Sequence, residues 1–124
     1  MARVDSPPSR LQVKKVFFDL TTFTYNDAQV FATLPANAVV VGHTIDCTTA
    51  LVADSGSPNV TLKIGSTDIL GARGFGAAPY DGTVIRPSVT TFKTTAETNV
   101  TVSVSSSYAT AGQFNYFIEY IMSA

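Results

Sequence analysis

The chain has 124 residues, of which 45% are hydrophobic and 14% are charged. This length fits one domain that buries a core without staples, and the single cysteine, Cys47, excludes an intrachain disulfide. Eight lysines and arginines against nine acidic residues give a net charge of −1, which provides no general attraction to nucleic acid or to anionic membranes. No apolar run approaches the length of a membrane span, so we expect neither nucleic acid nor a membrane as a partner.

The first ten residues, MARVDSPPSR, differ from the rest of the chain because they lack an apolar run and contain adjacent prolines. The absence of a signal-peptide core predicts synthesis in the cytoplasm. Adjacent prolines favour extended polyproline geometry, and arginines pair well with carboxylates of a neighbouring surface. We interpret residues 1–10 as an extended arm, with an ordinary frayed terminus as the alternative, and residues 11–124 as one domain. The residues expected to define the arm are Arg3, Pro7, Pro8 and Arg10.

Downstream of the arm, β-branched and aromatic stretches are separated by Gly, Pro and small polar residues, which is typical of short β-strands. In chain order the predicted strands are Leu11–Asp19, Thr21–Tyr25, Gln29–Thr33, Val39–Ala50, Val60–Ile64, Thr83–Arg86, Thr90–Lys93, Val100–Val104 and Phe114–Ile121. In Val100–Val104 the valines alternate with Thr and Ser, as in an antiparallel strand with one solvated face. No segment sustains a helical period of 3.6 residues, so we expect almost no helix.

Many short strands with turns between them predict an all-β fold, specifically an antiparallel β-sandwich of jelly-roll type. The Gly- and Ala-rich connection at Gly71–Gly82 is longer than a hairpin needs. It either crosses between sheets or carries binding contacts. Asn59 and Asn99, each followed by Val and Thr, match the glycosylation pattern, but we interpret both as strand starts.

The closing stretch QFNYFIEYIM, residues 113–122, is apolar on both faces of an extended strand. Two explanations stay open. Either a sandwich core covers one face and a neighbouring subunit covers the other, or the strand is central in a sheet that is packed on both sides within one chain. The first explanation makes the protein a homo-oligomer. The residues expected to pack against the neighbouring subunit are Phe114, Tyr116, Phe117, Tyr120 and Ile121.

Residues able to support catalysis are sparse. His43 and Cys47 lie four residues apart in one predicted strand, which separates their side chains by roughly 13 Å and prevents them from acting as base and nucleophile. One His, one Cys and scattered carboxylates cannot close a zinc site, and the Gly71–Gly82 connection lacks the spacing of a phosphate loop. We therefore expect no enzymatic activity, no metal and no cofactor.

Several stretches together resemble a known class of proteins. The valine-rich AVVVGHTIDCTTAL, the run VTLKIGSTDIL, the Gly/Ala connection and the closing TTAETNVTVSVSSSYATAGQFNYFIEYI are similar to small virion proteins of tailed bacteriophages. Decoration or cement proteins of the capsid are the nearest kind. The likeness covers residues 28–122 and consists of the strand rhythm and the closing AGQFNYFIEY pattern.

The resemblance implies a jelly-roll-like sandwich, often a homotrimer, that binds the major capsid protein on the outer surface of the head and stiffens the shell against internal DNA pressure. It implies a location in the virion after synthesis in the host cytoplasm, with no activity and no cofactor. The arm has no general counterpart in this family, and we expect it to dock on the capsid. The closing-strand positions that the resemblance carries over, for fold and subunit packing, are Gly112, Phe114, Tyr116 and Tyr120.

A rival prediction from another class is a sugar-binding or adhesive β-sandwich, such as a receptor-binding tip. Sites of this kind use exposed aromatic side chains, often Trp, as stacking platforms, and this chain has no Trp. A tail, neck or fibre component of the virion is a further alternative, which differs from a decoration protein only in its docking partner. The aromatic residues in or beside predicted loops are Tyr25, Phe75, Tyr80 and Tyr108.

Overall fold

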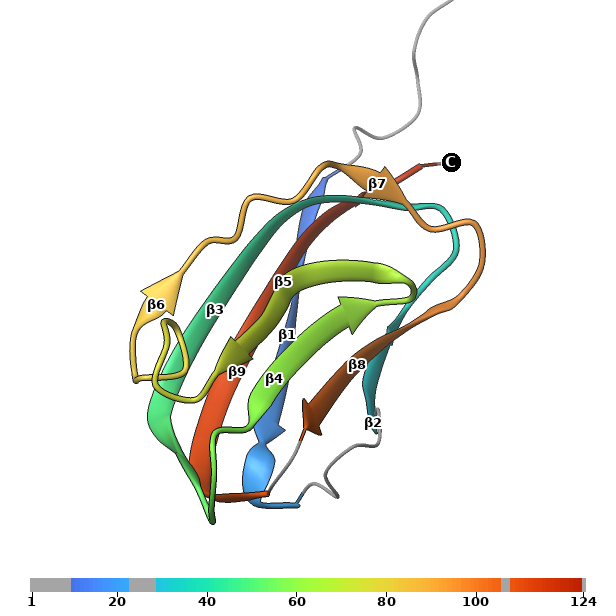
Figure 1. The fold of residues 1–124 in the computed structure, drawn as a ribbon. Coiled ribbons are helices and arrows are strands. Elements are labelled where there is room, and N and C mark those ends of the chain that lie inside the picture. Colours follow the sequence, from blue (N-terminus) through green and yellow to red (C-terminus); the bar gives the residue numbers. More distant parts are fainter. Residues whose placement is uncertain (1–9, 23–28, 106–107, 124) are drawn as a thin grey trace, which may run out of the picture.

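The computed structural model describes residues 10–22, 29–105 and 108–123. In these ranges nine β-strands and one short 3-10 helix form two antiparallel sheets that pack face to face (Figure 1). The antiparallel all-β sandwich expected from the sequence is confirmed, and its jelly-roll type stays a prediction. No helix in the described part of the chain is long and apolar enough to cross a membrane.

The first sheet brings the first and last strands of the chain together. Its order within the described residues is β1 (Leu11–Asp19), β9 (Ala109–Met122), β3 (Ala38–Ala53) and β6 (Val84–Ile85), with β7 (Phe92–Lys93) also paired to β3. The last strand is therefore central, because β9 pairs antiparallel with β1 on one side and with β3 on the other (Figure 1).

The second sheet shows the alternation that the sequence predicts. Its order in the described ranges is β2 (Gln29–Leu34), β8 (Thr98–Ser105), β4 (Asn59–Ile64) and β5 (Thr67–Gly74). Val100, Val102 and Val104 of β8 are fully buried, whereas Thr101 and Ser103 between them are partly exposed. Each strand of this kind gives the sheet one dry face and one wet face.

The core lies between the two inward faces. Aromatic rings pack together in it: Phe18 of β1 stacks on Phe114 of β9 with ring centroids 4.7 Å apart, and Tyr80, from the connection between β5 and β6, meets Phe114 edge-on at 5.4 Å. Across the sandwich, Phe31 of β2 approaches Phe18 at 4.6 Å. Such tilted and offset ring contacts add to the stabilisation that comes from burying apolar area.

The predicted strand Thr21–Tyr25 is wrong at its start, because Leu20–Thr22 form the 3-10 helix η1. The Asp19 carboxylate accepts hydrogen bonds from the backbone N–H of Thr21 at 3.0 Å and from its hydroxyl at 2.7 Å. This local capping turns the chain away from the sheet. Residues 23–25 lie outside the described residues.

The strand β5 (Thr67–Gly74) is not among the predicted strands, because Gly71, Gly74 and several exposed polar positions obscure its pattern. A tight turn at Gly65, whose φ is 58°, lets this segment pair with β4. The Gly/Ala connection therefore begins at Phe75 and runs from β5 in the second sheet to β6 in the first. The prediction that it crosses between sheets is confirmed.

The strand β9 starts at Ala109, five residues before the predicted Phe114, and Gly112 makes this extension possible. Gly112 has a φ of 144°, which side chains other than hydrogen rarely tolerate. A Cβ built there would lie 2.7 Å from Cγ of Leu51, a buried side chain of β3. Gly112 is thus a position at which both backbone conformation and packing require glycine.

We predict that Gly112→Ala lowers the free energy of unfolding by about 2 kcal/mol or more, because it adds backbone strain and overpacks Leu51. The matched control is Gly71→Ala, since nothing lies within 4 Å of a Cβ there. The control should stay within about 0.5 kcal/mol of the parent protein. Urea unfolding followed by circular dichroism measures both, and equal stability of the two variants would contradict this account of Gly112.

Candidate functional site

The outward side of the first sheet concentrates exposed apolar side chains. The described residues expose eight large hydrophobic side chains, and five of them, each 41–60% exposed, lie on this side. We call this side of the sheet the apolar face. Its exposed apolar members are Leu11, Val13, Phe17, Val41 and Val84.

Strand register explains why these residues share one face. Directly opposite residues of an antiparallel pair point to the same side of the sheet. Leu11 pairs with Ile121 and Lys15 pairs with Phe117, so alternate residues of β1 and β9 face outward together. Phe117 and Ile121, both partly buried, form the centre of the apolar face.

The outward side of the second sheet is chemically different. We call it the polar face, because partly exposed hydroxyl residues of β8 and the exposed ion pair between Lys63 and Asp68, at 3.6 Å, lie there. Val30, which pairs with Thr101, is its large exposed apolar residue. The contrast between the faces indicates that the apolar face is built for contact with another surface.

A polar cluster crosses the apolar face. Nη1 of Arg86 donates to Oε1 of Glu119 at 2.8 Å and to the hydroxyl of Thr44 at 2.7 Å. The Glu119 side chain lies over Gly42, where a Cβ would come within 2.9 Å of its carboxylate. Gly42 thus leaves the room that Glu119 needs to reach Arg86, and the two opposite charges neutralise each other within the chain.

The residues predicted for subunit packing fall into two groups. Phe114 and Tyr116 are fully buried in the core, so their packing partners lie within the same chain. Tyr120 packs against the edge of the core, and its hydroxyl donates to Oε1 of Gln12 at 3.2 Å. Phe117 and Ile121 lie on the apolar face, over which the described residues place no further layer. The closing strand is thus central in its sheet, as the second explanation expected, while a covering for Phe117 and Ile121, from a neighbouring subunit or from the same chain, stays a prediction.

Of the predicted arm, only Arg10 is among the described residues. It is exposed and directly precedes β1. Arg3, Pro7 and Pro8 lie outside the described residues, so the arm stays a prediction.

His43 and Cys47 both point into the core, where each forms a hydrogen bond with a different partner. The His43 ring lies between Phe92 and Tyr116, with centroids 6.5 and 5.9 Å away, and its Nδ1 shares a hydrogen bond with the Tyr116 hydroxyl. The Cys47 thiol donates to the carbonyl of Thr49 at 3.2 Å, and burial raises its pKa. Neither side chain is placed to activate the other.

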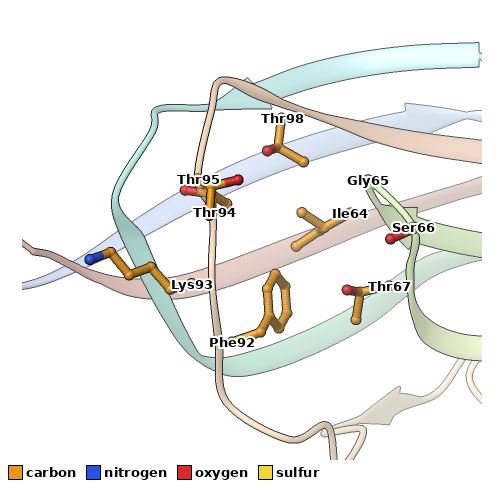
Figure 2. Close-up of a pocket in the computed structure, with 9 residues that line it drawn as sticks. All are labelled: Ile64, Gly65, Ser66, Thr67, Phe92, Lys93, Thr94, Thr95 and Thr98. Carbon is orange, nitrogen blue, oxygen red and sulfur yellow. The ribbon is translucent and has the colours of Figure 1, made fainter.

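A pocket of about 230 Å³ lies where the β4–β5 turn faces the segment after β7 (Figure 2). We call it the end pocket. Figure 2 shows Ile64 and Phe92 between hydroxyl side chains, with Lys93 pointing away from them. Its lining residues are Ile64, Gly65, Ser66, Thr67, Phe92, Lys93, Thr94, Thr95 and Thr98.

One hydroxyl of the end pocket, that of Thr94, forms hydrogen bonds with the backbone of the fold. Thr94 donates to the carbonyl of Pro35 at 2.7 Å and accepts from the N–H of Ala38 at 2.9 Å. The pocket lining contains no carboxylate and no side-chain amide. Within the described ranges no three His, Cys, Asp or Glu side chains come together as metal ligands. The end pocket therefore offers a shallow hydroxyl rim over an apolar floor.

The aromatic residues predicted as stacking platforms are mostly withdrawn from the surface. Tyr80 is 0% exposed and Phe75 is 7% exposed, whereas Tyr108 is 46% exposed. Tyr25 lies outside the described residues. Burial raises the pKa of Tyr80, whose hydroxyl has no hydrogen-bond partner among the described residues.

Comparison with solved structures finds the same fold in chains of phage capsids. A chain in the capsid of Ralstonia phage GP4 superposes with a TM-score of 0.69 and 18% identity, over 100% of this chain and 92% of that one. For the Cyanophage Pam1 capsid the values are 0.67 and 22%, over 98% and 94% of the two chains. For the acidic stable capsid of Helicobacter pylori bacteriophage KHP30 they are 0.70 and 12%, over 94% and 90%.

At these identities the likeness establishes the fold. No protein-family model matches the chain, and no curated protein matches it significantly. The resemblance to phage virion proteins that the sequence suggested is thereby confirmed at the level of fold.

We predict that His43 makes stability depend on pH. Burial lowers the pKa of His43 below its ordinary value of 6.5, with Arg86 acting in the same direction and Glu119 opposing. Below pH 6.5 the unfolded chain therefore binds a proton that the folded chain resists, so the free energy of unfolding falls as the pH decreases, by up to about 1.4 kcal/mol per pH unit. Asp19, whose hydrogen bonds to Thr21 lower its pKa from 3.8, contributes only at more acidic pH.

The measurement is urea unfolding of the parent protein and of His43→Gln between about pH 4.5 and 7.5, the window of the histidine transition. Gln keeps a hydrogen-bonding group beside Tyr116 but does not titrate. The variant should lose the histidine part of the pH slope. Parallel slopes for the two proteins would show that His43 does not control the pH dependence.

Proposed function

We propose that this protein is a bacteriophage capsid decoration, or cement, protein: a non-catalytic subunit that binds the major capsid protein on the outer surface of the head and stabilises the shell. The observation that carries this proposal is the match of 94–100% of the chain to chains in the capsids of three phages. In the virion the protein would then lie on the capsid surface.

The extent of the match supports an accessory subunit. The superpositions cover 90–94% of the other chains, so those chains are about as long as this one. The likeness thus extends over nearly the full length of the matched chains, which supports a small separate subunit.

The surface supports the same proposal. Cement proteins act through contact area, and the apolar face supplies exposed apolar area that spans neighbouring strands. The two side chains that could act as base or nucleophile, His43 and Cys47, are hydrogen-bonded in the core to the Tyr116 hydroxyl and the Thr49 carbonyl. A protein that acts only by binding to a surface needs no reactive side chain there.

Self-association and a docking arm complete the proposal. The resemblance implies a homotrimer, and light scattering of the isolated protein tests it against the 13.1 kDa of one chain. The arm would leave the sandwich at Arg10, beside the end of β9, because Leu11 pairs with Ile121. Figure 1 shows that β7 lies at the same end of the sandwich as the start of β1.

We predict that deleting residues 1–10 leaves the thermal midpoint unchanged and weakens attachment to heads that lack this protein. Because salt screens exposed charges, binding by the parent protein should fall with salt more steeply than binding by the truncated protein, so the loss on truncation should shrink as salt rises if the arginines of the arm contribute. Cosedimentation with undecorated heads across a salt series measures the attachment.

A charge-matched pair of variants isolates the arginines. Arg3→Gln and Arg10→Gln should each weaken head binding, whereas Lys63→Gln, which removes one positive charge from the polar face, should not. Equal head binding by truncated and parent proteins would reject the arm and make Leu70–Gly82, the end of β5 and the connection after it, the next region to mutate. Absence of head binding by the parent protein would reject the decoration role itself.

The end pocket is the observation that favours the rival sugar-binding function, because Phe92 and a hydroxyl rim suit the apolar side and the hydroxyls of a sugar ring. The lack of carboxylates and amides in its lining weakens this reading, since few groups can fix vicinal hydroxyls. A glycan array decides it: binding that Phe92→Ala abolishes would support a sugar site, and an array without signal would remove it.

A further inference from the structure

His43 is the only histidine of the chain, and only 2% of its surface is exposed. Residues 86–95, which we call the strap, run along the outer edge of β3 from the end of β6 to just beyond β7 and close over this histidine (Figure 1). We infer that the strap is a pH-sensitive cover: protonation of His43 favours its opening while both sheets stay folded. This inference concerns the isolated protein and does not depend on capsid binding.

An irregularity in β3 is the reason that His43 faces the core. Ala38 and Val40 of β3 point inward, and strict alternation would turn His43 outward. The register against β9 shifts between Val40 and Gly42, so the inward positions continue at His43 and Ile45. A β-bulge of this kind re-aims the side chains that follow it. The bulge thus places a titratable ring in the core, beside β7.

Uncharged groups enclose the ring of His43. Phe92 of the strap and Tyr116 of β9 lie on its two sides, nearly parallel to it, at interplanar angles of 12° and 17°. Burial raises the pKa of Tyr116, so its hydroxyl stays protonated beside Nδ1 of His43. A charged imidazolium in this place would lack the water that surrounds it in the unfolded chain.

The charged groups around His43 act in opposite directions. Glu119 of β9 favours the charged ring, but its carboxylate is bonded to Arg86 of the strap, which opposes that effect. Lys93 is exposed, and its Nζ donates to the Ser123 hydroxyl at 3.2 Å. Below the ordinary histidine pKa of 6.5, the protonated ring is therefore more stable in a state that admits water than in the closed core.

The strap is the most weakly held part of this enclosure. Residues 86–91 have no regular structure, β7 has two residues, and no strap residue before Thr94 is fully buried. Val89 and Phe92 pack only partly against the core, whereas Tyr116 is fully buried in the central strand. Segments with little buried apolar area open at a lower free energy than the whole fold. Movement of the strap at Phe92 is thus the least costly way for water to reach the ring.

Opening the strap would also change the end pocket. Four of the nine lining residues, from Phe92 to Thr95, belong to the strap, and they face the turn between β4 and β5 (Figure 2). His43 and the end pocket therefore share the Phe92 side chain. The pocket keeps this wall only while the strap is closed, and a molecule bound against Phe92 would in turn oppose protonation of His43.

Amide hydrogen exchange as a function of pH, corrected for intrinsic exchange rates, tests the inference. The reporter is the Thr94 amide, which donates to the Ala38 carbonyl, and the reference is the Leu51 amide, which donates to the Tyr80 carbonyl, both at 2.9 Å. From about pH 6.5 to 4.5 the ratio of open to closed states at Thr94 should rise, by up to about tenfold per pH unit, because opening takes up one proton. At every pH this ratio should be at least about tenfold smaller at Leu51.

Two variants separate the roles of the histidine and its cover. In His43→Gln the ratio at Thr94 should no longer depend on pH. Phe92→Ala should move the pKa of His43 toward 6.5, because water then reaches the ring, and the ring signals of the one histidine report this pKa by NMR. The matched control is Phe31→Ala, which truncates a partly buried phenylalanine of β2 in the second sheet and should leave the pKa of His43 unchanged.

Three outcomes would overturn the inference. Equal ratios at Thr94 and Leu51 would mean that the strap opens only when the whole protein unfolds. A ratio at Thr94 that does not change with pH in the parent protein, or that keeps its pH dependence in His43→Gln, would mean that the strap does not respond to His43. An unchanged pKa of His43 in Phe92→Ala would show that Phe92 is not its cover.

Discussion

The pairing of β9 with β1 on one side and β3 on the other is the constraint on which the rest of the structure depends. It points Phe114 and Tyr116 into the core and Phe117 and Ile121 to the surface. Because side chains alternate along a strand, a register shift of one residue would exchange these two sets. The core and the apolar face are therefore two results of a single register, and a change that disturbs one disturbs the other.

Local patterns were enough to predict much of the fold. β1 was predicted with its observed bounds, and the valines of Val100–Val104 are buried as their alternation indicated. Two local features account for the errors. Hydrogen bonds to Asp19 stabilise η1 where the start of a strand was predicted, and the glycines of β5 weaken its strand pattern. Tertiary pairing through the turn at Gly65 stabilises β5 despite its weak strand propensity.

The candidate site was less predictable, because it depends on which strands become neighbours. The apolar closing strand indicated a contact surface, but the sequence could not show that Phe17 on β1 would share a face with Asp46 on β3. Nor could it show that Gly42 makes room for Glu119 to reach Arg86, since these residues are far apart in the chain. Long-range register is the information that a strand pattern lacks.

The protein combines a fold shared with chains of three phage capsids, a surface suited to protein contact and a core that holds the few reactive side chains. We propose on these grounds that it lies on the outside of a phage head. A cryo-EM map of the virion that carries this protein tests that claim most directly. The account predicts that the two-sheet sandwich fits repeated density on the outer surface of the shell, in contact with the major capsid protein. Density for the sandwich only in the tail, neck or fibres, or none on the shell, would contradict it.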